Sequence, residues 1–146
     1  MVEIETFLRG ADGSFTLADS CQTPPLDPDY IEGAIRISID GLEIIGLEEW
    51  DYVDQLWCYI AEMSTKLRSS GYARTHFPDQ PIELAFQASG SRVLVTAKVG
   101  KTTKTASASS TELLKSIQAA GNIFFGKMSE LAPGNSYAEA QQELSK

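Results

Sequence analysis

Residues 31–45 read IEGAIRISIDGLEII, and this stretch decides the fold class. From 31 to 40, isoleucines and a glycine alternate with polar or small residues, which is the pattern of a strand with one buried face. Asp40-Gly41 then predicts a tight turn, because a type I′ turn needs positive φ at both central residues. Residues 42–45 return as a short strand that ends at Gly46. The stretch therefore predicts a β-hairpin and an antiparallel sheet.

Alternation of apolar and polar residues predicts further strands on both sides of this hairpin. Ser89-Gly90-Ser91 turns the chain between two of them, and residues 76–81 predict a turn before them. Residues 100–110, rich in Thr and Ser, fit either an edge strand or a mobile loop. The predicted strands are 2–9, 82–88 and 92–99, with a weaker one around 14–17.

Two long helices are predicted from apolar residues at three- and four-residue steps. The first covers 50–68 and the second 111–131, where Ser109 and Glu112 have the spacing of a capping box. Gly121 lies in the second apolar stripe. Since glycine costs a helix about 1 kcal/mol relative to alanine, we expect it to allow close approach to the sheet.

These elements predict an α+β fold, because antiparallel hairpins and one-sided helices bury their apolar faces against each other. We expect a two-layer sandwich, in which a mainly antiparallel sheet of five or six strands carries both long helices on one face. Residues 1–132 are expected to form a single domain. Residues 133–146 form a short C-terminal tail that is either a helix capped by Ser136 or frayed.

The sequence displays no catalytic, cofactor or metal signature, so we predict a protein that is not an enzyme and that needs neither cofactor nor metal. His76, the only histidine, lies beside a turn without a recognisable nucleophile. The glycines lack phosphate-loop spacing, and Cys21 and Cys58 lack metal-ligand spacing. No apolar run could span a bilayer, and the N-terminus does not resemble a signal peptide, so a cytoplasmic location with reduced thiols is expected.

The strongest functional signal is the distribution of charge. Residues 1–66 contain fourteen Asp and Glu against three Lys and Arg, whereas residues 67–146 contain six against nine. A concentrated negative field repels nucleic acid and anionic membranes and attracts basic partners. The basic segment with Lys98, Lys101 and Lys104 has no interleaved aromatic residues, so we expect no nucleic-acid site there.

On the first predicted helix, an acidic arc lies opposite the apolar stripe. We expect its acids to have no basic partner four positions away, and two tyrosines add contacts that are common in interfaces. Charge reversal at Asp51, Asp54 and Glu62 is therefore expected to weaken partner binding and leave the fold intact. A solvated helix face is the competing interpretation, and the open sheet face with Glu3, Glu5, Arg36 and Glu83 is the alternative interface. The predicted partner-binding residues are Glu48, Asp51, Tyr52, Asp54, Gln55, Tyr59 and Glu62.

Several blocks of sequence have a recognisable character: IEGAI at 31–35, Asp40-Gly41, WDYVDQLW at 50–57 and FPDQP at 77–81. Together they resemble the small bacterial immunity proteins of polymorphic-toxin and contact-dependent growth inhibition systems, over roughly residues 31 to 90. The resemblance implies a non-enzymatic, cytoplasmic protein that binds a cognate toxin domain and blocks its activity. The acidic composition is consistent with this, since many nuclease toxins are basic in order to hold phosphates.

Two other classes stay open. A type III secretion chaperone-like protein, which would bind an effector, is also small and acidic. Such chaperones are expected to begin with a helix and to form dimers, whereas this chain is predicted to begin with a strand. A small enzyme would need a constellation of catalytic residues that the sequence does not display.

Overall fold

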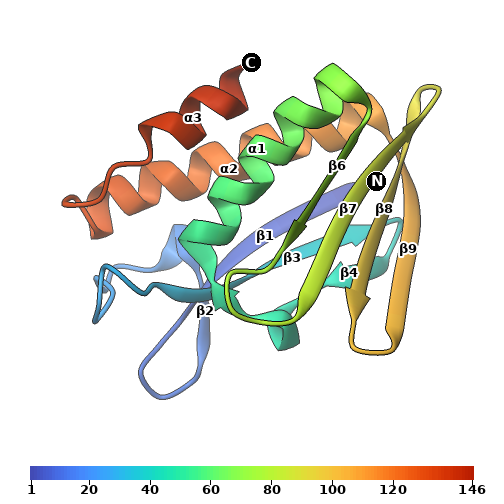
Figure 1. Ribbon diagram of the computed structural model, residues 1–146. Helices are drawn as coiled ribbons and strands as arrows, with labels where there is room; N and C mark the ends of the chain where they lie inside the picture. The colour runs from blue at the N-terminus through green and yellow to red at the C-terminus, as the bar shows by residue number, and fades with distance from the viewer.

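The structure, a computed structural model, describes residues 1–146 as two antiparallel sheets and three helices (Figure 1). Two short 3₁₀ turns, η1 (Ala18–Ser20) and η2 (Leu47–Glu49), lie between strands. The first sheet contains β1 (Val2–Arg9), β2 (Phe15–Leu17), β3 (Glu32–Ile39), β4 (Leu42–Ile45) and β5 (Asp51–Tyr52). The second contains β6 (Tyr72–His76), β7 (Ile82–Ser89), β8 (Arg92–Val99) and β9 (Thr102–Ser109). The helices are α1 (Val53–Ser70), α2 (Ser110–Leu131) and α3 (Ala138–Ser145).

The α+β class and the antiparallel pairing predicted from the sequence are confirmed, with the strands divided between two sheets. The first sheet has the order β2-β1-β3-β4, and β5 also pairs with β3. The second sheet is a meander in the order β6-β7-β8-β9. Strand β4 contacts β8 and β9, so the two sheets meet along this line.

The hairpin predicted at 31–45 forms as β3 and β4. Asp40 and Gly41 have φ angles of 50° and 85°, as a type I′ turn requires. Strand β1 pairs with the other edge of β3, where Glu5 lies opposite Arg36. The Glu5 carboxylate accepts hydrogen bonds from Arg36 Nε at 3.1 Å and Nη2 at 2.6 Å. This register places the isoleucines of β3 on the buried face of the sheet.

The second sheet settles one open alternative and corrects one boundary. Residues 102–109 form β9, so the strand interpretation of the Thr- and Ser-rich segment is the right one. Strand β6 was not predicted, and the turn expected at 76–81 starts one residue later, because His76 ends β6 opposite Glu83.

Helices α1 and α2 lie on the inner faces of both sheets (Figure 1). Helix α1 contacts β3, β6 and β7, while α2 contacts β1, β8 and β9. The ring of Trp57 on α1 stacks on Phe124 of α2 with centroids 6.2 Å apart, and its Nε1 donates to Thr6 Oγ1 at 3.0 Å. One contiguous apolar core therefore joins both sheets and the helices.

The C-terminal helix α3 packs against α1 and α2, and its Leu144 is fully buried in the core. A Cβ atom added at Gly121 would lie 2.6 Å from Leu144 Cδ1 and 3.1 Å from Trp57 Cζ3. The expectation that Gly121 faces the sheet is therefore wrong, since it gives room to α3 and α1. The helix starts after Tyr137, and Ser136 does not cap it. None of the three helices combines the length and hydrophobicity needed to cross a membrane.

Candidate partner-binding site

The acidic arc predicted on the first helix is not a single exposed surface. Asp51 is only 3% exposed, and its carboxylate accepts hydrogen bonds from three backbone amides. The amides of Tyr52 and Gln80 donate at 2.7 and 2.8 Å, and that of Asp79 donates at 3.1 Å to both oxygens. Asp51 therefore ties β5 to the loop after β6, and its role in the fold is structural.

Asp54 is also buried, because the C-terminal segment covers it. The hydroxyl of Tyr137 donates to Asp54 Oδ2 at 2.8 Å, and the backbone amide of Gln55 donates to Oδ1 at 2.9 Å. Burial raises the pKa of Asp54 and, with Asp54 nearby, raises the pKa of the Cys58 thiol to about 11. Further along α1, Thr65 Oγ1 donates to the Glu143 carbonyl of α3 at 3.2 Å, so the C-terminal segment also covers this part of the helix.

The remaining predicted residues have mixed environments. Glu48 is exposed, and Tyr52, Gln55 and Tyr59 are half-buried. Glu62 is exposed, but its carboxylate lies 3.4 Å from Lys66 Nζ, four residues along the helix. The expectation that these acids lack an internal basic partner is therefore wrong. The structure does not bring the seven residues together as one solvent-exposed surface.

The negative charge instead belongs to the first sheet and its loops. Residues 1–52 contain twelve Asp and Glu against two Arg, whereas residues 72–109 contain two against five Lys and Arg. Many of these acids are exposed and form no ion pair. They are Glu3, Asp12, Asp19, Asp27, Asp29, Glu43 and Glu48, with Asp79 and Glu139 from elsewhere in the chain.

Part of this charge surrounds a group of aromatic side chains. The rings of Tyr30 and Tyr52 lie 5.5 Å apart, and Tyr30 is 59% exposed. Beside them, a small hollow of about 70 Å³ opens between β3, β5 and the loop after β6. Desolvation, followed by the negative charges of Asp79 and Glu32, raises the pKa of Tyr52. We call this region the acidic aromatic surface; it consists of Asp27, Asp29, Tyr30, Glu32, Trp50, Tyr52 and Asp79.

The acidic aromatic surface already holds one cation of this chain. The guanidinium of Arg9 lies over the ring of Trp50, 4.2 Å from its centroid, and Nη1 donates to Glu32 Oε1 at 3.1 Å. Carboxylates next to aromatic faces are a favourable environment for Lys and Arg side chains. The surface therefore has the chemistry to bind further basic side chains.

Sequence reasoning missed most of this surface. Three of its seven residues, Asp27, Asp29 and Tyr30, lie in the connection between β2 and β3, where the sequence has no apolar periodicity. The sequence Leu26-Asp-Pro-Asp-Tyr30 could have pointed to this surface, because it places an apolar and an aromatic residue beside two acids in a loop. Leu26 is 86% exposed and Tyr30 is 59% exposed, and tyrosine is one of the residue types enriched in interfaces.

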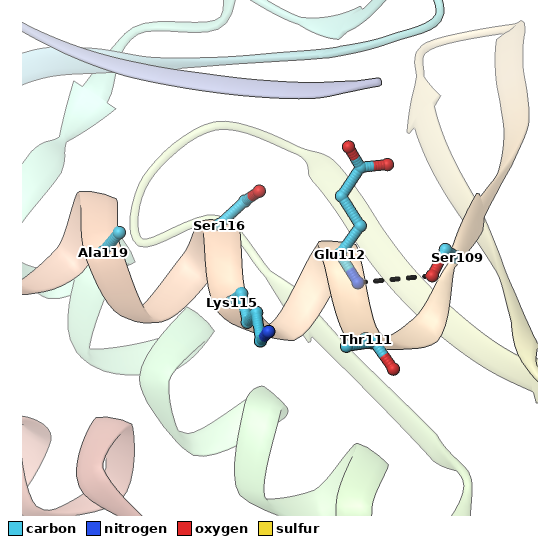
Figure 2. A pocket seen from close by; sticks show the side chains of 6 residues that line it. All are labelled: Ser109, Thr111, Glu112, Lys115, Ser116 and Ala119. Carbon is cyan, nitrogen blue, oxygen red and sulfur yellow. Dashed lines mark hydrogen bonds between the residues drawn. The ribbon is translucent and has the colours of Figure 1, made fainter.

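A second hollow is an open depression of about 460 Å³ along the start of α2 (Figure 2). All of its lining residues except Ala119 have polar side chains, and Glu112 donates its backbone N–H to the capping Ser109 Oγ at 3.3 Å. Figure 2 shows that Glu112 and Lys115 extend from the helix in different directions. These side chains do not converge on a common point, so the depression offers no arrangement for chemistry.

The remaining reactive groups are scattered. His76 is exposed at the end of β6, with Nε2 3.9 Å from Glu83 Oε2. Cys21 and Cys58 are free thiols. No group of three or more His, Cys, Asp or Glu side chains is placed to hold a metal ion. In comparisons with protein-family models, curated proteins and solved structures, the chain matches none.

Proposed function

We propose that this protein is a non-enzymatic, cytoplasmic inhibitor that binds a basic toxin domain through the acidic aromatic surface. The observation that carries the proposal is the set of exposed acids without ion pairs around the Tyr30–Tyr52 pair. The resemblance of residues 31–90 to immunity proteins supplies the class of partner.

Electrostatics favours such a partner in two ways. Unpaired carboxylates on one side of a molecule attract a positively charged protein over long range and accelerate the encounter. At contact, Tyr and Trp side chains bury a large area at a low cost in side-chain entropy. Tyr30 and Tyr52 would provide these anchors, and Asp29 and Asp79 would accept hydrogen bonds from Lys or Arg of the toxin.

The test is protection of cells that express the toxin domain encoded in the neighbouring gene. Wild-type protein is expected to restore growth and to copurify with that domain. The variant Asp27→Asn/Asp29→Asn/Asp79→Asn removes three charges from the acidic aromatic surface and is expected to protect poorly. The matched control Glu62→Gln/Glu130→Gln/Glu139→Gln removes three exposed charges from the helices and is expected to protect fully. Full protection by the first variant would place the interface elsewhere.

A further inference from the structure

The loop that carries Asp27, Asp29 and Tyr30 has few restraints of its own. It is anchored at one end by Ala18 of η1 and at the other by Ile31, both of which are buried in the core. Between them, residues 22–30 are almost entirely exposed. Within the loop, the amides of Asp29 and Tyr30 both donate to Asp27, at 2.9 and 3.1 Å. These local bonds fix a turn but do not fix its position on the protein.

Apart from the ring contact between Tyr30 and Tyr52, a single hydrogen bond joins residues 22–30 to a distant part of the chain. Asn135 Nδ2 donates to the Pro28 carbonyl at 2.8 Å, across 107 positions of sequence. Asn135 lies in the connection between α2 and α3, which Figure 1 shows at the same end of the molecule as this loop. The C-terminal segment therefore reaches over to hold the acidic loop.

Asn135 is itself fixed by a chain of partners. Its second N–H donates to the Tyr137 hydroxyl at 3.0 Å, and that hydroxyl donates to Asp54 Oδ2 at 2.8 Å. The Tyr137 ring packs against the fully buried Phe125, with centroids 5.2 Å apart. The chain Asp54–Tyr137–Asn135–Pro28 thus links the first turn of α1 to the middle of the loop.

We propose that Asn135 and Tyr137 are positioning residues that hold residues 22–30 in the conformation that presents Asp27, Asp29 and Tyr30 to the partner. A binding loop that is already ordered loses less conformational entropy on association, which strengthens binding without a new contact. The importance of this for binding rests on the proposed function. The restraint itself is a property of the free protein and is measured without any partner.

The test is backbone ¹⁵N relaxation of the free protein, with the amides of Asp29 and Tyr30 as reporters. In the wild type, both are expected to have order parameters near 0.85, the value of rigid backbone. In Asn135→Leu, which removes the donor to Pro28, they are expected to fall below about 0.6. Tyr137→Phe keeps the ring on Phe125 but removes the hydroxyl that orients Asn135, so it is expected to give a smaller decrease.

The matched control is Asn122→Leu, which changes an exposed asparagine on α2 that makes no hydrogen bond to the loop. It is expected to leave the order parameters of the Asp29 and Tyr30 amides unchanged. All variants are expected to leave the order parameters of the β7 and β8 amides unchanged. Rigid loop amides in Asn135→Leu would overturn the inference. Equal loosening of β7 and β8 would also overturn it, since the effect would then be global. The protection assay with the Asp27, Asp29 and Asp79 variant fails or succeeds independently of this result.

Discussion

Asp51 gives the sharpest stability prediction, because the sequence assigned it to a binding surface and the structure buries it. The change Asp51→Ala removes the acceptor of the Tyr52, Asp79 and Gln80 amides. A hydrogen bond to a charged group contributes about 1.5–3 kcal/mol. The loop amides of Asp79 and Gln80 can bind water once Asp51 is gone. The loss of unfolding free energy is therefore well below the sum of the three hydrogen-bond contributions. We expect a decrease of about 3 kcal/mol in the free energy of unfolding.

Urea denaturation followed by circular dichroism measures this loss. With a slope of about 2 kcal/mol per molar urea for a domain of this size, the midpoint of Asp51→Ala is expected to fall by about 1.5 M. The slope itself is expected to stay unchanged, because the fold is the same. Glu48→Ala is the matched control, since Glu48 is an exposed acid three residues away and should change stability by less than about 0.5 kcal/mol. An Asp51→Ala midpoint as close to the wild type as that of the control would refute the structural role.

Three further predictions concern other buried groups. Burial raises the pKa of Asp54, so the folded state holds its proton more tightly than the unfolded state does. The resulting stability is present below the unfolded pKa of about 4 and is lost as the pH rises through the raised folded pKa. Asp54→Asn, which stays neutral, should therefore gain stability relative to wild type as the pH of paired urea titrations is raised through this window, and a constant difference would contradict this. The Cys58 thiol, with a pKa of about 11, should be about one part in a thousand thiolate at pH 8. In a Cys21→Ser background, iodoacetamide should label folded protein about a hundredfold more slowly than unfolded chain, and mass spectrometry showing equal rates would refute the burial of Cys58. Gly121→Ala should lower the unfolding free energy by about 1–2 kcal/mol, as overpacking against Leu144 exceeds the gain in helix propensity. Leu144→Ala should cancel that cost in a double-mutant cycle, and additive effects would show that the two residues are not in contact.

Local patterns in the sequence predicted much of the fold. The hairpin at 31–45, which forms β3 and β4, and strands β1, β7 and β8 follow from alternation and from Asp40-Gly41, both of which act within a few residues. Strand β6 has a single fully buried residue, Ala73, so its alternation is too weak to detect. The division into two sheets depends on contacts between distant segments, such as β4 with β8 and β9, which no local pattern encodes.

At the candidate site, too, contacts between distant segments decide which residues are exposed, and local sequence patterns do not encode these contacts. A helical projection of the predicted helix at 50–68 uses only its own residues, so it presents Asp51 and Asp54 as exposed. In the structure α1 begins at Val53, and Asp51 lies in β5 before it. Their burial comes from partners 28 and 83 residues away, in the loop after β6 and in the C-terminal segment. The Glu62–Lys66 pair, in contrast, lies within the helix and could have been recognised from its spacing. The charge asymmetry itself was visible, but its location on the first sheet and its loops required the fold.

The central claim is that the acidic aromatic surface attracts a basic partner. Stopped-flow association with the toxin domain of the neighbouring gene tests it most directly when the rate constant is measured against salt concentration. Wild type and Glu62→Gln/Glu130→Gln/Glu139→Gln are expected to associate rapidly, with rates that fall steeply as salt is added. Asp27→Asn/Asp29→Asn/Asp79→Asn is expected to associate about tenfold more slowly at low salt, with a flatter dependence. Equal effects in the two triple variants would contradict the claim, because net charge rather than this surface would then govern association.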